Sequence, residues 1–459
     1  MAKEEKKVKK QTTPKEPKVP QLLRGFKDVL PAEQYIWKHV RSVVDSFVNA
    51  YGYTEVGLPL LEESNLFVRA VGKQTDIVEK EMFTFADHDG SVTLRPEATA
   101  SVARAYINHG MLNLPQPIKM YYWGPMFRRE KPQAGRLRQF HQFGFEVLGD
   151  SNPVIDAQLI AVAYMIFAQL GLPEISIQVN SIGCPDCRKQ FREELVSYYK
   201  SKRRMLCEDC KKRLVKNPMR LLDCKQPQCQ ALRAEAPQIV DWLCEPCKTH
   251  FMKVIEYVDE LDIPYVLNPY LVRGLDYYTR TVFEIWPSEQ LEGSQSGLGG
   301  GGRYDGLVEL LGGRPTPAAG FACGIERLII QLKEKGAPIP NVDHSSLFLA
   351  QIGDQAKIKA MSLFEKLRQE GIRVGESFAK DSLKAQLELA NKLGARYVLI
   401  LGQKEVLDGT ILIRDMESGV QEIVDFNKTV TEIKKKLQAQ AQVAQNASLS
   451  QSIGVDVEK

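Results

Sequence analysis

The chain has 459 residues, of which 44% are hydrophobic and 26% are charged, and its formal net charge is +4. This length allows two or three domains, and the composition is that of a globular protein. No apolar run approaches 18 residues and the N-terminus lacks the apolar core of a secretory signal, so we predict a cytoplasmic protein with no membrane span.

The two ends of the chain differ from the rest in composition. Residues 1–20 carry seven Lys and three Glu, a net charge of +4, so residues 21–459 sum to zero. Any polyanion binding by the folded part must therefore come from local basic patches. We predict a basic disordered arm over residues 1–20 and a second disordered tail over residues 438–459.

Residues 22–171 mix helical and strand patterns. Apolar residues at helical spacing predict helices over residues 32–51 and 155–170. Between them, the segment TEVGLPLLEE predicts a short strand interrupted at Pro59.

The segment 126–149 contains a strand whose two faces differ. One face suits a core and consists of His141, Phe143, Phe145 and Val147. The other face carries Phe140, Gln142, Gly144 and Glu146, and the glycine leaves room for something to approach the sheet. Guanidinium groups for anions stand nearby at Arg128, Arg129, Arg136 and Arg138. We predict a floor for a small polar ligand; a solvated hairpin is the alternative.

Eight of the nine cysteines lie in a 64-residue window that is also rich in Lys and Arg. They form Cys184-x2-Cys187, Cys207-x2-Cys210, Cys224-x4-Cys229 and Cys244-x2-Cys247. The 19 residues between the first two pairs match the spacing in zinc ribbons, and eight thiolates can fill two tetrahedral sites. We predict structural zinc, up to two ions. Redox or disulfide chemistry and incidental thiols are the alternatives, and the sequence leaves open which pairs share an ion.

Two further segments combine strands with unusual loops. In LVRGLDYYTRTVFEIW, a loop with Arg273, Tyr277 and Tyr278 leads into a strand; two adjacent loop tyrosines either bind something or pack at a rim. In SGLGGGGRYDGL, the glycines make a continuous backbone surface, for which a flexible linker is the alternative. No Lys-Ser/Thr follows, so this is not a Walker loop.

GFACGIERLIIQL predicts a helix with an apolar stripe at Ile325, Leu328, Ile329 and Leu332. Arg327 lies off that stripe in the first turn, where a cation opposes the helix dipole. Either Glu326 offsets this charge, or Arg327 and the helix N-terminus together hold a phosphate.

Residues 336–344 (GAPIPNVDH) predict a linker to a second α/β unit. SLFLAQIG, RYVLILG and GTILIRDM predict strands, and residues 358–369 and 383–393 predict helices. Strands that alternate with helices of this length indicate a small doubly wound sheet.

Together, these segments resemble bacterial-type histidyl-tRNA synthetases, a class II aminoacyl-tRNA synthetase family, over about residues 21–437. The residues near Pro59 resemble the family's first motif, the 126–149 segment its second and GFACGIERLI its third. LVRGLDYYTRTVFE and SGLGGGGRYDGL resemble its two histidine-specific signatures, and TLRPEAT (residues 93–99) resembles its amino-acid-binding loop. The joint match is very specific, although several of the single segments are weak signals.

The resemblance implies an α+β fold, in which an antiparallel sheet flanked by helices carries the active site. The implied class II catalytic domain spans residues 21–337, with the Cys-rich insertion at 181–255 placed where the family reaches toward the tRNA acceptor arm. An α/β anticodon-binding domain follows at 345–437. Eight cysteines are not a requirement of the family, so zinc rests on their spacing alone.

The implied activity has two steps. L-histidine attacks the α-phosphate of ATP, supplied with Mg²⁺, to give histidyl-adenylate, and the histidyl group then passes to the 3′ end of tRNA-His. The nucleophile is a carboxylate that is ionised at neutral pH, so no general base is needed and positioning and charge stabilisation should dominate. The family works as a homodimer, with the first motif at its interface.

The resemblance also implies roles for particular residues. Catalysis falls to Arg273, Arg128 and Arg327. Histidine binding falls to Glu97, Ala98, Thr99, Arg128, Gln142, Glu146, Arg273, Tyr277 and Tyr278. ATP binding falls to Arg128, Glu130, Arg136, Phe140 and Arg327. Lys131 stands where an arginine is common in the family, so the resemblance does not carry an acceptor-end contact over to this position.

Two non-catalytic alternatives share the fold. One is the synthetase-like regulatory subunit of ATP phosphoribosyltransferase, which lacks signature residues and the anticodon domain that this chain has. The other is a zinc-dependent RNA-binding or scaffold protein with an inert synthetase core, against which Arg128, Glu146, Arg273 and Arg327 argue, since fold alone does not fix function.

Overall fold

The computed structural model describes residues 19–440, apart from residues 89, 134, 289–296 and 340–345. The chain divides into two compact units, Met1–Ile339 and Pro340–Lys459. The division falls in the predicted linker. Most of the predicted arm and nearly all of the predicted tail lie outside the described residues.

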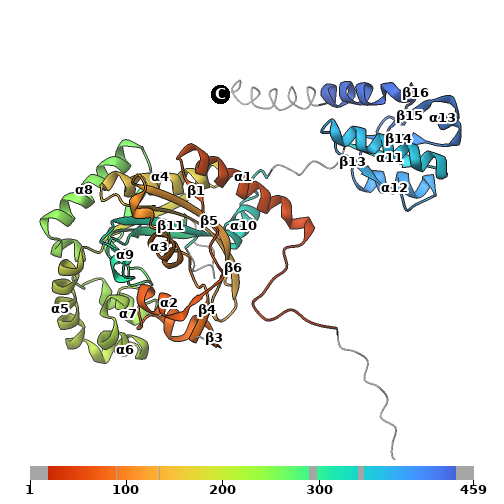
Figure 1. Cartoon of the computed structure of the whole chain (residues 1–459). Helices are drawn as coiled ribbons and strands as arrows, with labels where there is room; N and C mark the ends of the chain where they lie inside the picture. The colour runs from red at the N-terminus through yellow and green to blue at the C-terminus, as the bar shows by residue number, and fades with distance from the viewer. Residues whose placement is uncertain (1–18, 89, 134, 289–296, 340–345, 441–459) are drawn as a thin grey trace, which may run out of the picture. The chain divides into compact units, whose positions relative to one another are not determined.

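An eight-stranded sheet forms the centre of the first unit (Figure 1). Its strands follow the order β1-β5-β6-β11-β10-β9-β7-β8. Neighbours pair antiparallel except at the two edges, where β1 runs parallel to β5 and β8 runs parallel to β7. The antiparallel sheet predicted for this unit is confirmed. The strands are β1 (Thr54–Glu55), β5 (Ile118–Phe127), β6 (Gln139–Leu148), β7 (Ile175–Ser181), β8 (Tyr265–Leu267), β9 (Thr279–Pro287), β10 (Gly299–Arg303) and β11 (Ala318–Gly324).

Helices cover both faces of this sheet. One face packs against α1 (Gln34–Ala50), α4 (Pro153–Gln169), α8 (Glu245–Glu260) and α10 (Ile325–Glu334) in a single apolar core. The other face packs against α2 (Ser64–Val71), α3 (Thr99–Asn108) and α9 (Leu307–Leu310). The helices predicted over 32–51 and 155–170 correspond to α1 and α4.

The predicted strand near Pro59 is split in two. Its first part, β1, joins the large sheet, while β2 (Leu61–Glu63) pairs with β4 (Gly90–Leu94) in a separate three-stranded sheet completed by β3 (Phe83–Asp87). Short helical turns complete this region: η1 (Pro31–Glu33), η2 (Ile77–Glu81) and η3 (Met111–Asn113).

The cysteine-rich insertion is helical and lies beside the sheet (Figure 1). It comprises α5 (Pro185–Ser201), α6 (Glu208–Lys216) and α7 (Pro227–Arg233), with turns η4 (Arg203–Met205), η5 (Pro218–Leu221) and η6 (Ile239–Trp242). The boundary predicted at residue 255 falls inside α8. Val254 and Val258 of that helix are fully buried in the core of the large sheet, so the end of α8 belongs to that core and not to the insertion.

The second unit has a five-stranded sheet in the order β13-β12-β14-β15-β16. β13 (Val374–Glu376), β12 (Leu347–Gln351) and β14 (Tyr397–Leu401) are parallel, whereas β15 (Thr410–Asp415) and β16 (Gln421–Asp425) are antiparallel. The sheet predicted as doubly wound thus has three parallel strands followed by two antiparallel strands. Its helices are α11 (Asp354–Gln369), α12 (Leu383–Lys392), α13 (Gln403–Asp408) and η7 (Phe426–Lys428).

The last described segment, residues 429–440, is helical and crosses the boundary predicted between 437 and 438. Within the described ranges, no helix is long and apolar enough to cross a membrane.

Candidate active site

Strand β6 has the two faces that its sequence predicts. Phe143, Phe145 and Val147 are fully buried in the core. On the opposite face, Phe140 and Gln142 line a cavity of about 340 Å³. The solvated-hairpin alternative is therefore wrong, and β6 is the floor of a cavity.

Gly144 makes room for a protein ring. Tyr122 pairs opposite it on β5, and a Cβ added at Gly144 would lie 2.3 Å from Tyr122 Cζ. The sequence suggested that an external ligand approaches here. The tyrosine ring takes that space instead and lines the cavity.

Glu146 is almost fully buried at the end of this floor. Its carboxylate accepts hydrogen bonds from the Thr99 hydroxyl, at 2.7 Å, and from the Tyr304 hydroxyl. Burial raises the pKa of Glu146 to about 8, although these two hydrogen bonds oppose the shift. Glu146 therefore holds a proton at neutral pH.

Glu97 caps the N-terminus of α3. Its carboxylate accepts the backbone N–H groups of Thr99, at 2.8 Å, and Ala100, at 3.0 Å, and also the Tyr277 hydroxyl at 3.3 Å. Burial raises the pKa of Glu97, whereas the two backbone bonds lower it. Glu97 and Thr99 line the cavity, while Ala98 is buried between them and is not one of its lining residues.

The tyrosine pair lies inside the site. Tyr277 and Tyr278 are 6% and 5% exposed, and their ring centroids are 4.7 Å apart. Both line the cavity, so the rim-packed alternative is wrong. The tyrosines are held between Glu97 on one side and Arg273 on the other, because the Arg273 guanidinium carbon lies 5.3 Å from the Tyr278 ring centroid.

Arg273 rests on the glycine strand β10. A Cβ added at Gly300 would lie 2.6 Å from Arg273 Nη1, so only glycine leaves space for this guanidinium. The four glycines are part of a paired strand, and the linker alternative is wrong. Arg273 also forms an ion pair with Glu284, which raises the pKa of the arginine although burial acts in the opposite direction.

Three arginines converge elsewhere along the cavity wall. Arg136 Nη1 donates to Glu130 at 3.3 Å, and Arg128 Nε donates to the Pro96 carbonyl at 2.9 Å. Arg327 donates to the carbonyls of Gly135 and Gly297 at 2.9 and 2.8 Å. Burial lowers the pKa of Arg327 to about 10, and the neighbouring charges of Arg136 and Arg128 add to this effect. The wall is therefore electropositive and suits an anion.

Two residues near these arginines bear on the sequence predictions. The Arg128 guanidinium carbon lies 5.2 Å from the ring centroid of Phe140, so this aromatic face is occupied by a cation in the described structure. Glu326 accepts the backbone N–H of His141 at 2.8 Å and lies 2.8 Å from its Nδ1. The bonds of the Glu326 carboxylate thus go to His141, and Arg327 bonds backbone carbonyls.

Sequence reasoning assigned no role to several residues that line the cavity: Tyr122, Asp223, Lys225, Glu284 and Trp286. It also gave none to Tyr304, which bonds Glu146. Tyr304 and Glu284 stand inside the quoted signature segments. Only strand pairing reveals that they reach the site.

The structure also sorts the eight clustered cysteines into two groups of four. Cys184, Cys187, Cys244 and Cys247 form one group, and Cys207, Cys210, Cys224 and Cys229 form the other. Within each group all Sγ atoms lie within 4.8 Å of one another, and all eight cysteines are free thiols. The pairing that the sequence left open is thereby given by the fold.

Comparisons with known proteins agree with this geometry. A family model described as histidyl-tRNA synthetase matches residues 25–328, and one described as anticodon binding domain matches residues 339–436. The histidine–tRNA ligase of Dehalococcoides mccartyi is 46% identical over 415 residues, which cover 90% of this chain and 99% of the relative. That of Pelotomaculum thermopropionicum is 44% identical over 420 residues, covering 91% and 98%. The crystal structure of apo S. aureus histidyl-tRNA synthetase aligns with a TM-score of 0.76 at 37% identity, covering 90% and 99%.

Proposed function

The chain belongs to the histidyl-tRNA synthetase family, and on that premise we propose that it is a histidine–tRNA ligase. In the first step, the carboxylate of L-histidine attacks the α-phosphate of ATP, giving histidyl-adenylate and releasing pyrophosphate. In the second step, the histidyl group passes to the 3′-terminal adenosine of tRNA-His and AMP leaves.

One observation carries the proposal: three arginines share one wall of a cavity that is also lined by the buried carboxyl group of Glu97. Burial lowers the pKa of Arg327 to about 10, with a further contribution from the neighbouring charges of Arg136 and Arg128, so the three guanidinium groups repel one another. A triphosphate removes this repulsion. We assign Arg327 to the terminal phosphate and Arg128 to the α-phosphate and the histidine carboxylate. Arg136 and Glu130 border the ATP site. Adenine is assigned to Phe140, whose ring already has the Arg128 guanidinium on one face.

We assign the other end of the cavity to histidine. Glu146 and the Tyr277/Tyr278 pair read the imidazole, because a buried carboxyl group and phenol hydroxyls match its two ring nitrogens. The α-ammonium falls to Glu97, Thr99 and Gln142, with Ala98 fixing the backbone between the first two. A pocket built for these hydrogen bonds excludes side chains that leave the buried groups unpaired.

The chemistry follows from positioning and charge. The attacking carboxylate is already ionised at neutral pH, so it needs no base. Arg273 stabilises the charge that develops on the α-phosphate. This role is supported by the position of Arg273 in the lining of the cavity, beside Tyr277 and Tyr278.

Magnesium is proposed to enter with ATP. Each carboxylate that lines the cavity already bonds a protein group: Glu97, Glu130, Asp223, Glu284 and Glu326. Such a site favours a cation held mainly by phosphate oxygens and water.

The remaining parts of the proposal concern partners and location. The second unit matches an anticodon-binding domain, which supports recognition of tRNA-His. A homodimer is supported by Leu60 and Leu61, which are 43% and 51% exposed beside Pro59. We also propose a cytoplasmic location, and structural zinc in the two cysteine groups, whose all-thiolate donors suit that ion.

Charging of tRNA-His with labelled histidine and ATP tests the function. A histidine–tRNA ligase charges this tRNA and leaves tRNAs for other amino acids uncharged. A regulatory subunit or a scaffold with the same fold charges none of them, and that result would remove the proposal.

A further inference from the structure

The cysteine group formed by Cys184, Cys187, Cys244 and Cys247, called the base group below, lies where the insertion leaves and rejoins the catalytic body. Cys184 Sγ is 3.5 Å from Cys187 Sγ and 4.0 Å from Cys244 Sγ. A zinc ion with four thiolates at about 2.3 Å places neighbouring sulfurs roughly 3.8 Å apart. A disulfide requires about 2.05 Å. The sulfur positions therefore fit a tetrahedral metal site and not a pair of disulfides.

The backbone around the base group favours thiolates. Cys184 is the N-cap residue of α5 and Cys244 is the N-cap residue of α8. The backbone N–H of Cys244 donates to Cys187 Sγ at 3.1 Å. Helix N-termini and N–H donors both stabilise negative sulfur, which is the form that binds metal.

The second group, called the distal group below, repeats this arrangement inside the insertion. Cys207 is the N-cap residue of α6, and its Sγ lies 3.8 Å from Cys224 Sγ. The N–H of Cys207 donates to Cys229 Sγ at 3.4 Å. All four of its cysteines lie within the insertion, between α5 and α8, so the distal group is an internal control for the base group.

The base group is connected to the tyrosine pair through α5. Arg188, the residue after Cys187, donates from Nη1 to the Tyr278 carbonyl at 2.9 Å. The backbone N–H of Arg280 donates to the Gly183 carbonyl at 2.9 Å, next to Cys184. Arg280 has φ 52°, a left-handed conformation that needs such support in a residue other than glycine. The segment that carries Tyr278 thus forms hydrogen bonds just before and just after the first cysteine pair, Cys184 and Cys187.

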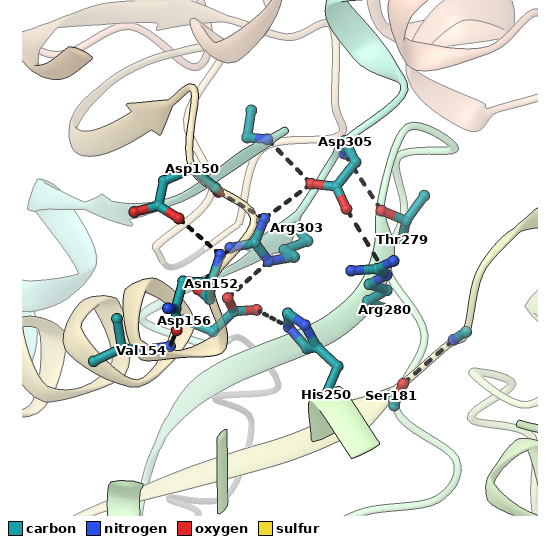
Figure 2. Close-up of polar contacts among 12 residues, drawn as sticks. Asp150, Asn152, Val154, Asp156, Ser181, His250, Thr279, Arg280, Arg303 and Asp305 are labelled. Carbon is teal, nitrogen blue, oxygen red and sulfur yellow. Dashed lines mark hydrogen bonds and ion pairs between the residues drawn. The ribbon is translucent and has the colours of Figure 1, made fainter. Parts of the chain in front are cut away.

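A second connection runs through α8 (Figure 2). His250 lies one turn after Cys247, and its Nε2 is 3.4 Å from Asp156. Asp156 accepts a hydrogen bond at 2.7 Å from Arg303, whose side chain is fully buried. The next residue, Tyr304, donates its hydroxyl to Glu146. This chain of contacts leads from the base group to the carboxyl group assigned to the imidazole.

We propose that the base group binds zinc and that this ion, by holding the starts of α5 and α8 together, positions the histidine pocket through Arg188 and His250. The coupling to histidine rests on the proposed function. The distal group binds a second zinc ion that stabilises the insertion alone. Arg188 and His250 are positioning residues in this scheme.

The experiment compares two double variants of the untagged full chain, Cys244→Ser/Cys247→Ser in the base group and Cys224→Ser/Cys229→Ser in the distal group. Elemental analysis should find about two zinc ions per wild-type chain and about one in each variant. The base variant should raise the histidine KM about tenfold or more, because misplacement of a binding group by 1 Å is costly. The ATP KM of the base variant should stay within about threefold of the wild-type value. The histidine KM and the ATP KM of the distal variant should do the same.

Arg188→Met keeps all eight cysteines and replaces the base variant in the experiment if that variant does not fold. It should retain about two zinc ions and still raise the histidine KM. A zinc-free wild-type chain overturns the metal site, and equal effects of the two double variants on the histidine KM overturn the coupling. Zinc content is measured without catalysis, so failure of the metal site and failure of the ligase function are told apart.

Discussion

The hydroxyl of Thr99, a residue that lines the cavity, donates a hydrogen bond at 2.7 Å to the buried carboxyl group of Glu146. Burial raises the pKa of Glu146 to about 8, so the carboxyl group that we assign to the imidazole is neutral near pH 7. It can donate its proton to the ring nitrogen of a neutral histidine. The bound state then contains one proton, which the Glu146 carboxyl group and the histidine imidazole share in a hydrogen bond.

The histidine KM should therefore have a minimum between about pH 6.5 and about pH 8. Below about pH 6.5 free histidine is an imidazolium and one of two protons must leave. Above the Glu146 pKa of about 8 the shared proton is missing, so the affinity should fall about tenfold per pH unit. KM values from pyrophosphate exchange between pH 5.5 and 9.5 check this. If the rise of the histidine KM above about pH 8 were the same in Glu146→Gln, that rise would have to come from another group, such as the α-ammonium of histidine.

Stability should depend on pH through the same group. The folded chain keeps the Glu146 proton up to about pH 8, whereas the unfolded chain releases it near pH 4.5. The unfolded state thus binds fewer protons in this window, and the free energy of unfolding falls as pH rises through it. Glu146→Gln does not titrate, so its stability relative to wild type should increase from pH 5 to pH 8 by on the order of 3 kcal/mol. Denaturant unfolding at both pH values measures the difference, and a constant difference contradicts the assignment.

Gly300→Ala should impair histidine activation. The new Cβ would lie 2.6 Å from Arg273 Nη1 and 2.7 Å from the Phe283 carbonyl, so the guanidinium must move. We expect a loss of about 100-fold in adenylate formation for a displacement near 1 Å. Gly306→Ala is the matched control, because nothing lies within 4 Å of the added Cβ. Rates are compared per folded protein, as judged by circular dichroism; equal rates in the two variants would mean that Arg273 is wrongly placed.

Arg327→Gln should weaken ATP far more than histidine. Loss of a hydrogen-bonded charge removes about 1.5–3 kcal/mol, which corresponds to a rise of roughly 10- to 100-fold in the ATP KM. Lys333→Gln on the same helix is the control, because Lys333 pairs with Glu33 at the surface and should leave the ATP KM unchanged. If Arg327→Gln raised the ATP KM and the histidine KM equally, the assignment of Arg327 to ATP would be wrong, and the residue would either bind histidine or only stabilise the fold.

The sequence predicted local features well. The alternation of β6 follows from a two-residue period, and the first-turn position of Arg327 follows from the apolar stripe of its helix. The end of the insertion, predicted at residue 255, falls inside α8. The cysteines indicate where the insertion folds, but they do not indicate where α8 begins to pack on the large sheet. The C-terminal sheet was predicted as a small doubly wound sheet. The antiparallel pairing of β15 and β16 was not predicted, because strand periodicity alone does not give strand direction.

Features that depend on distant contacts could not be predicted. Tyr122 fills the space at Gly144 only because β5 pairs with β6 in one register. Tyr304 reaches Glu146 across β10 and β11, over 158 positions of sequence. The two cysteine groups are nested, since the first and last pairs enclose the middle four, and a linear spacing rule favours neighbouring pairs instead.

Histidine-dependent exchange of labelled pyrophosphate into ATP tests the central claim most directly, because it follows adenylate formation without tRNA. We predict exchange that requires L-histidine and ATP, is not supported by other amino acids, and is strongly reduced in Arg273→His. Absence of exchange with histidine, in protein that is folded, would contradict the claim that this cavity activates histidine.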